Sequence, residues 1–143
     1  MINDYKDLVV WQKAMRLVEE IYRLVSFLPK EEMYGLSDQM RRAVVSIPSN
    51  IAEGYDRNSD KELANFLHIA RGSCAELETQ ILICINLGYF QEKQIETAFN
   101  LLIEVRKMLN AFIKKNNRIA ISYRQSAISY QLPRLSAKIG GLI

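Results

Sequence analysis

Apolar residues recur at alternating spacings of three and four along four stretches of the chain. This spacing places them on one face of an α-helix and predicts helices over residues 8–28, 36–54, 60–87 and 91–117. The longest regular series belongs to the third stretch and consists of Leu63, Leu67, Ala70, Cys74, Leu77, Ile81 and Cys84. The first stretch carries two such series side by side, and a helix with so wide an apolar face is expected to contact two neighbours.

Residues that typically begin or end helices lie between these stretches. The expected N-caps are Asp7, Ser37 and Ser59, and the expected end signals are Pro29, Gly54, Gly88 and the pair Asn116–Asn117. Ser59 is followed three residues later by Glu62, which is the capping-box pattern. Because the connections are short, consecutive helices should be antiparallel neighbours. The chain is therefore predicted to be all-α, with an antiparallel up-down-up-down four-helix bundle over residues 1–117.

The remainder of the chain, residues 118–143, has a different pattern. The motif AISY occurs at 120–123 and again at 127–130, and the apolar residues around it alternate with other residues as in a strand rather than a helix. No second strand is evident for it to pair with. We therefore expect residues 118–143 to be a basic, low-complexity tail without stable structure of its own.

The composition agrees with a compact helical domain. Apolar residues make up 49% of the 143 residues, and three prolines and six glycines leave little room for the turns of a β-protein. The long uncharged window at residues 79–91 is too short to cross a bilayer, and the N-terminal residues lack the pattern of a signal peptide. We expect a cytoplasmic protein that makes no membrane contact.

Few residues are available for metal or catalytic chemistry. Cys74 and Cys84 form no CxxC pair and His68 is the only histidine, so we expect free reduced thiols, a surface histidine and no zinc site. The motifs of P-loop nucleotide hydrolases, dinucleotide-binding enzymes, serine hydrolases and zinc proteases are absent. The sequence thus predicts no metal, no cofactor and no enzymatic activity.

The second predicted helix contains a proline among small polar residues, in SIPSNIAEG at 46–54. Proline inside a helix lacks the N–H of the repeating hydrogen bond and costs roughly 3 kcal/mol. The third predicted helix carries a glycine in its middle, Gly72, at a cost of about 1 kcal/mol relative to alanine. We interpret both features as close helix–helix or subunit packing. The expected oligomer-interface residues are Ser46, Pro48, Ser49, Asn50, Glu53, Gly72, Ser73 and Glu76.

Positive charge is concentrated in the last part of the chain. Residues 1–104 contain 11 basic and 16 acidic residues, whereas residues 105–143 contain eight basic residues and no acidic residue. This distribution suggests an anionic partner or a solvated tail. Basic residues on a bundle also form surface ion pairs, which is their commoner use. The candidate nucleic-acid-binding residues are Arg41, Arg42, Arg57, Arg71, Lys107, Lys114, Lys115 and Arg118.

Several linked motifs give the chain a family resemblance over residues 4–115. They are WQKA at 11–14, YGL at 34–36, Gln39 with Arg41–Arg42, SIP and NIAEG within 46–54, and ARGS with ELE within 70–78. In these motifs the sequence resembles the four-helix bundle proteins encoded in intervening sequences of bacterial 23S ribosomal RNA genes. The resemblance implies an antiparallel bundle that assembles into a closed ring, a homopentamer. A similar fold occurs in the accessory protein of diversity-generating retroelements, which binds nucleic acid and a reverse transcriptase.

Two functions remain open on these grounds. The first is a non-enzymatic, ring-forming bundle that binds nucleic acid, with structured RNA as the favoured ligand, through its basic residues. The alternative is a protein-interaction scaffold, or an accessory subunit for a mobile-element protein such as a reverse transcriptase, without direct contact to nucleic acid. Salt separates the two, because binding to phosphate weakens steeply as the salt concentration rises.

Overall fold

The computed structural model describes residues 3–131, and it describes side chains for residues 3–118. Its elements are, in chain order, the short 3-10 helix η1 (Tyr5–Asp7), the helix α1 (Val9–Val25), the 3-10 helix η2 (Lys30–Glu32), and the helices α2 (Leu36–Tyr55), α3 (Asp60–Asn86) and α4 (Glu92–Gln131). The described part of the chain contains no β-strand, which confirms the predicted all-α fold.

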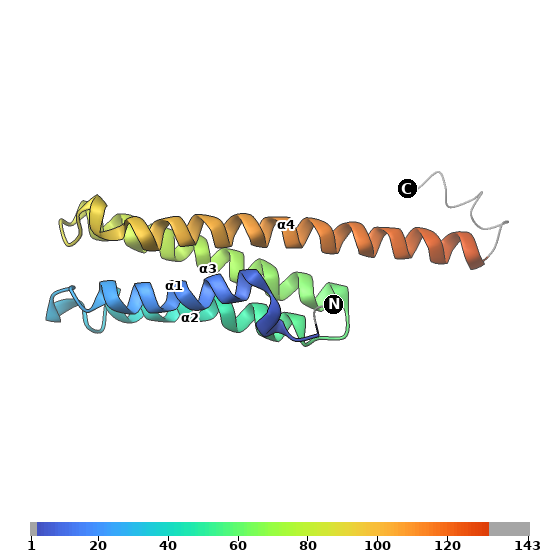
Figure 1. The fold of residues 1–143 in the computed structure, drawn as a ribbon, viewed down its shortest axis with the longest axis horizontal. Coiled ribbons are helices and arrows are strands. Elements are labelled where there is room, and N and C mark those ends of the chain that lie inside the picture. The colour runs from blue at the N-terminus through green and yellow to red at the C-terminus, as the bar shows by residue number, and fades with distance from the viewer. Residues whose placement is uncertain (1–2, 132–143) are drawn as a thin grey trace.

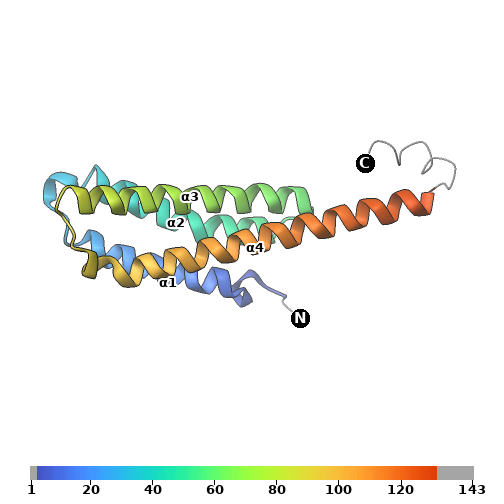
Figure 2. The same ribbon diagram turned by 90° about the horizontal axis from the view of Figure 1, so that it is seen from above.

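The α-helices form an antiparallel bundle (Figure 1). Each helix packs against the next along the chain, and α4 also packs against α1 and so closes the bundle. Short connections join consecutive helices at alternate ends, so that α1 and α3 run one way while α2 and α4 run the other (Figure 2). The predicted up-down-up-down arrangement is confirmed.

The centre of the bundle is filled by apolar residues that the sequence pattern picked out. The α1 series from Ala14 to Leu24 and the α3 series from Leu67 to Cys84 are fully buried. Their burial removes apolar surface from water, which is worth about 25 cal/mol per Å². The second apolar series of this helix, which runs from Leu8 through Tyr22 to Val25, is only partly covered, since Tyr22 remains 45% exposed.

Both ends of α3 agree with the sequence signals. Ser59 Oγ accepts the N–H of Glu62 at 3.2 Å and lies 3.1 Å from its carboxylate, so the predicted cap is confirmed. At the other end, Gly88 has a φ of 79°, and the N–H groups of Gly88 and the following residue donate to carbonyls of the last helical turn. This is the Schellman arrangement, whose left-handed residue is usually glycine.

Two predicted N-caps are wrong. Asp7 ends η1, and the N-cap position of α1 is Leu8. Ser37 is buried inside the first turn of α2 and does not cap it. The carboxylate of Glu32 takes this role, because it accepts the N–H of Leu36 at 3.1 Å. A carboxylate beside a helix N-terminus is also favoured by the helix dipole.

Gly54 lies within α2 rather than after its end, because α2 continues to Tyr55. A Cβ atom at position 54 would lie 2.7 Å from the Cβ of Phe66 and 3.3 Å from a methyl carbon of Leu63. Side chains cannot approach so closely without displacing their neighbours. The absence of a side chain at Gly54 therefore allows α2 to approach α3 closely, and the predicted role of Gly54 in ending the helix is wrong.

The largest departure from the sequence prediction concerns the end of α4. The helix does not end at Asn116–Asn117 but runs to Gln131, so residues 118–131 are helical rather than without stable structure. Its 40 residues contain neither glycine nor proline, and the first helix-breaking residue is Pro133. Asn116 is buried and donates to the carbonyl of Asp60 at 2.9 Å, so it anchors α4 to the start of α3. The rest of the predicted tail, residues 132–143, lies outside the described residues.

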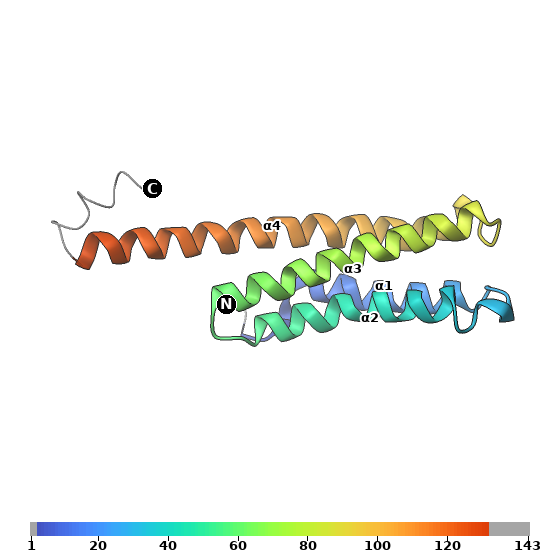
Figure 3. The same cartoon turned by 180° about the vertical axis from the view of Figure 1, so that it is seen from behind.

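Beyond Asn116, α4 leaves the bundle. Figures 1 and 3 show the helix continuing past the ends of α1, α2 and α3. Residues 117–131 form this projecting part. At about 1.5 Å per residue they extend about 22 Å from the bundle.

Candidate nucleic-acid interface

The eight basic residues expected to contact nucleic acid form two groups in the structure. In the first group, Arg41 and Arg42 lie on α2, Arg57 lies just after α2, and Arg71 lies on α3. The second group lies on α4 and consists of Lys107, Lys114, Lys115 and Arg118. The two groups differ in what surrounds their charges.

Arg42 and Arg57 of the first group form ion pairs within the chain. Arg42 Nε lies 3.1 Å from a carboxylate oxygen of Asp38, and Arg57 Nη2 lies 3.1 Å from a carboxylate oxygen of Glu53. The Arg57 guanidinium also lies over the ring of Phe66, 5.2 Å from its centre. Such exposed pairs contribute at most about 1 kcal/mol to stability. Each nevertheless places a negative charge beside the guanidinium and weakens its attraction for phosphate.

Arg41 and Arg71 have partners other than carboxylates. Arg71 donates to Asn110 Oδ1 at 3.2 Å, and its other terminal nitrogen lies 3.1 Å from Nδ1 of His68, which is exposed as expected. Arg41 donates to the backbone carbonyl of Met33 at 3.5 Å. Within the described residues, neither guanidinium has a carboxylate beside it, but Arg71 is fixed as a link between α3 and α4.

The second group has no partner among the side chains that the structure describes. All four side chains are exposed, and none forms an ion pair or hydrogen bond with residues 3–118. Lys107, Lys114 and Arg118 are separated by seven and four residues, so they lie on one face of α4. Arg106, their neighbour in sequence, differs because it forms an ion pair with Glu78 of α3.

Acidic residues do not offset the charge of this part of α4. The last acidic residue of the chain is Glu104. Its carboxylate accepts a hydrogen bond from Lys13 of α1 at 2.6 Å, and this bond lowers the pKa of Glu104. The carboxylate is therefore already bound to a cation on α1. Between Glu104 and Arg118, the exposed face of α4 therefore presents positive charge alone.

The residues expected at an oligomer interface also form two groups, one with contacts inside the chain and one exposed on its surface. The hydroxyl oxygens of Ser46 and Ser73 lie 2.8 Å apart and join α2 to α3. Asn50 Nδ2 donates to the Ser46 carbonyl at 2.7 Å and to its hydroxyl at 2.9 Å. Pro48 is buried within the helix and offers no surface to a second copy. These four residues serve contacts within one chain, which supports the helix–helix interpretation for them.

The other four expected interface residues, Ser49, Glu53, Gly72 and Glu76, are exposed. A Cβ atom at Gly72 would meet nothing within 4 Å. Packing within the described residues therefore gives no reason for a glycine in the middle of α3. Glu53 is bound to Arg57, and Glu76 accepts a hydrogen bond from Gln80 at 3.3 Å. The surface around Gly72 remains open to another molecule.

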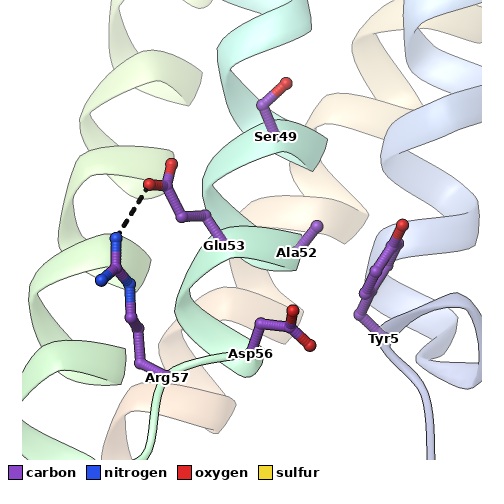
Figure 4. Close-up of a pocket in the computed structure, with 6 residues that line it drawn as sticks. All are labelled: Tyr5, Ser49, Ala52, Glu53, Asp56 and Arg57. Carbon is purple, nitrogen blue, oxygen red and sulfur yellow. Dashed lines mark hydrogen bonds and ion pairs between the residues drawn. The ribbon is translucent and has the colours of Figure 1, made fainter.

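An open depression of about 510 Å³ lies between η1 and the C-terminal end of α2. Figure 4 shows Tyr5 facing Ala52 and Asp56 across it, on the side of α2 away from the ion pair. Among the described residues of its lining, Arg57 is the only cation, and it is bound to Glu53; Asp56 adds a second carboxylate. The depression is therefore poorly suited to phosphate.

The described residues offer little for nucleophilic or metal chemistry. Cys74 and Cys84 are free and buried, as expected, and burial raises their pKa values to about 12 and about 11. Such thiols stay protonated at neutral pH and react slowly. Within the described part of the chain, no group of three His, Cys, Asp or Glu side chains could hold a metal ion.

None of the described helices combines the length and the apolar character that a membrane span requires.

Comparison with known proteins identifies the family. The model of the family described as 23S rRNA-intervening sequence protein matches residues 6–111. The chain belongs to this family. It is also similar to the crystal structure of a protein of unknown function from the S23 ribosomal protein family of Bacteroides thetaiotaomicron, with 30% sequence identity and a TM-score of 0.69. That similarity covers 74% of this chain and 99% of the other. No curated protein matches the chain.

The 23S rRNA-intervening sequence protein match ends before most of the unpaired basic residues. Lys107 lies inside the matched range, whereas Lys114, Lys115 and Arg118 lie after it. The projecting part of α4 also lies after it, and neither the motifs nor the apolar spacing predicted this helix. The signal that could have revealed it was the absence of glycine and proline over residues 92–131.

Proposed function

We propose that this member of the 23S rRNA-intervening sequence protein family is a non-enzymatic nucleic-acid-binding protein that uses the exposed face of α4. The supporting observation is the row formed by Lys107, Lys114 and Arg118, which has no partner among the described residues. At about 1.5 Å per residue, the row extends about 16 Å along the helix. A cationic row of this length can follow several phosphates of a nucleic-acid backbone.

Structured RNA is the favoured ligand. Lysine and arginine on a smooth helix face contact phosphates, and such contacts fix position without reading base sequence. A ligand bound in this way is selected by charge density and by shape, which is how folded RNA is commonly recognised. The family name refers to 23S rRNA, and a ribosomal RNA helix is a ligand of this kind. The cytoplasmic location expected from the sequence fits this role.

The proposal includes assembly into a homo-oligomer, with the ring of five copies that the family resemblance implies. The open surface at Gly72 supports assembly, because glycine in mid-helix usually has a packing reason and no described residue lies within 4 Å of where its Cβ atom would be. Repeating the α4 row in every copy would add phosphate contacts without any new residue, and linked contacts strengthen binding.

Titration of the full chain with a fluorescein-labelled RNA hairpin and with a DNA duplex, followed by fluorescence anisotropy, tests the proposal. Each phosphate contact adds about 0.9 to the slope of log affinity against log salt for duplex DNA. Three contacts therefore predict about a 40-fold loss of affinity between about 50 mM and about 200 mM salt. The variant Lys107→Glu/Lys114→Glu/Arg118→Glu should lose binding at both salt concentrations.

A matched variant controls for net charge. Arg16, Lys30 and Lys61 are exposed and form no ion pair with the described residues. Changing all three to glutamate alters the net charge of the chain by the same amount as the α4 variant. We expect this control to bind much better than the α4 variant. Equal loss in both variants, or no binding of the unaltered chain at low salt, would refute the proposal.

The alternative function is a protein-interaction scaffold or an accessory subunit for a mobile-element protein such as a reverse transcriptase. The observation that favours it is the exposed apolar surface at the end of the bundle opposite the projecting helix. Tyr34, for example, is 90% exposed in the connection before α2. A contact made through such surface would change little with salt. Salt-insensitive binding of a partner protein, together with no binding of RNA, would favour this alternative.

A further inference from the structure

A groove lies where α3 finishes and α4 begins, at the end of the bundle opposite the projecting helix. It has a volume of about 520 Å³. Its lining includes the apolar residues Leu82 and Ile85 of α3 and Ile95 and Phe99 of α4, together with the carboxylates of Glu92 and Glu96 on α4. We call this feature the α3–α4 groove. Leu82 is 45% exposed on its wall, and exposed apolar side chains gathered in one place often mark a contact surface.

Exposed apolar residues continue from the groove onto the end of the bundle. Leu87, which follows α3, is 57% exposed, and Ile83 is partly exposed beside the groove residue Leu82. The connection between α1 and α2 lies next to this end, since Tyr89 donates to Glu32 at 3.2 Å. That connection carries the exposed side chains of Phe27 and Tyr34. Apolar surface is thus collected at one end of the molecule.

The groove also carries a net negative charge. Glu92 and Glu96 are four residues apart and therefore lie one turn apart on the same face of α4. Neither carboxylate forms an ion pair with a residue of the described chain. Among the described residues that line the groove, Lys93 is the only cation, so the two carboxylates outnumber it. A ligand for this groove should therefore combine apolar side chains with positive charge.

The sequence that follows α4 has this combination. Residues 132–143 read LPRLSAKIGGLI and contain no acidic residue. Arg134 and Lys138 are four residues apart, as are Leu135 and Ile139. We infer that this segment of a second copy binds in the α3–α4 groove. Bound as a helical turn, its two cations would meet Glu92 and Glu96 while its apolar residues contacted the groove walls.

The length of α4 rules out the same contact within one chain. Glu96 and Gln131 are separated by 35 residues of continuous helix, which at about 1.5 Å per residue is about 53 Å. Lys138 follows Gln131 by seven residues, and seven fully extended residues reach at most about 25 Å. The segment therefore falls about 28 Å short of its own groove. Its partner must be another copy.

A contact between the segment of one copy and the groove of the next is heterologous. Repetition of such a contact closes into a ring when the rotation between copies permits it, and otherwise forms an open filament. This inference uses residues other than the α4 row, so it does not depend on the proposed binding of nucleic acid.

Sedimentation velocity of the full chain, without nucleic acid, tests the inference through charge reversal. One variant alters the groove, Glu92→Arg/Glu96→Arg, and the other alters the segment, Arg134→Glu/Lys138→Glu. Each variant alone brings like charges together, and its association constant should fall by about a hundredfold. An equimolar mixture of the two should associate again, because each groove then meets a segment of opposite charge. Recovery in the mixture also shows that both variants are folded.

Two further variants match these in charge but lie elsewhere on the surface. Asp7→Arg/Glu19→Arg controls for the groove variant, and Arg16→Glu/Lys61→Glu controls for the segment variant. Both should associate as the unaltered chain does. The inference is overturned if the unaltered chain does not associate, if the groove and segment variants associate normally, or if their mixture fails to recover association.

Discussion

The contact between α2 and α3 and the C-terminal half of α4 contain similar polar and basic residues but differ in how these residues are bound. Between α2 and α3, Ser46 meets Ser73 at 2.8 Å, and Arg57, which follows α2, pairs with Glu53 of α2 at 3.1 Å. On α4, the row that begins at Lys107 has no partner among the described residues. The first region uses its polar groups to hold the chain together, while the second leaves its charges available.

The difference shows why residue type alone is a weak guide to function. Arg42 and Lys114 are both exposed cations, but a carboxylate lies 3.1 Å from the first and the described residues offer none to the second. A carboxylate beside a guanidinium offsets part of its positive charge and weakens its attraction for phosphate, whereas an ammonium without such a neighbour keeps its full attraction. Nucleic-acid binding is therefore expected on α4 rather than on α2 and α3.

The largest expected effect tests this difference directly. Neutralising the α4 row with Lys107→Gln/Lys114→Gln/Arg118→Gln should lower affinity for an RNA hairpin about a hundredfold near 0.1 M salt. The slope of log affinity against log salt should fall by about three. Neutralising the bound arginines, Arg42→Gln/Arg57→Gln, should change both quantities much less. Fluorescence anisotropy over a salt series measures both variants, and equal losses would show that the division into bound and free charges is wrong.

The second prediction concerns the close approach of α2 to α3. Gly54→Ala introduces a Cβ 2.7 Å from the Cβ of Phe66, which belongs to the rigid base of that side chain. The helices must separate, and we expect the free energy of unfolding to fall by roughly 1–3 kcal/mol. Urea denaturation followed by circular dichroism measures this. A stability equal to that of the unaltered chain would mean that the two helices do not touch at Gly54.

The bundle could be predicted from the sequence because its apolar spacing is long and regular. Every member of the α3 series from Leu67 to Cys84 is buried, and the cap at Ser59 was recognisable from Glu62 three residues later. The end of α4 was harder to predict. Asparagine is only mildly unfavourable in a helix, and the bond from Asn116 to the Asp60 carbonyl depends on a residue 56 positions away.

Which basic residues of the candidate site have ion-pair partners could be predicted from the sequence only in part. Asp38 with Arg42 and Glu53 with Arg57 are four residues apart, a spacing that favours ion pairs on a helix. Partners on different helices, such as Lys13 with Glu104, depend on the packing of the bundle and leave no local signal. The unpaired row on α4 could be recognised only after these partners were known.

Removal of the hydrogen bond between α2 and α3 should have a smaller effect on stability. Ser73→Ala removes a buried hydroxyl group and leaves Ser46 bonded to Asn50 alone. The free energy of unfolding should fall by about 1 kcal/mol, the usual net value of one hydrogen bond. Binding of RNA should not change, since the α4 row is untouched. Urea denaturation and the anisotropy titration together check both expectations, and a loss of RNA affinity would contradict the separation of the two regions.

The smallest expected effect comes from Gly72, the counterpart of Gly54 on the open side of α3. A Cβ atom there meets nothing within 4 Å, so Gly72→Ala should raise the stability of a single copy by roughly 0.5–1 kcal/mol through helix propensity. Urea denaturation at low protein concentration, where copies are separate, measures this gain.

If a second copy packs closely on this face, the same methyl group should weaken assembly even though it stabilises the single copy. Sedimentation velocity at higher protein concentration would detect that opposite change. Stabilisation without any loss of assembly would show that the surface at Gly72 lies outside the subunit contact. The glycine would then be unnecessary for both packing within the chain and packing between copies. Assembly would have to rely on other surfaces, of which the α3–α4 groove is the one with a complementary segment in the sequence.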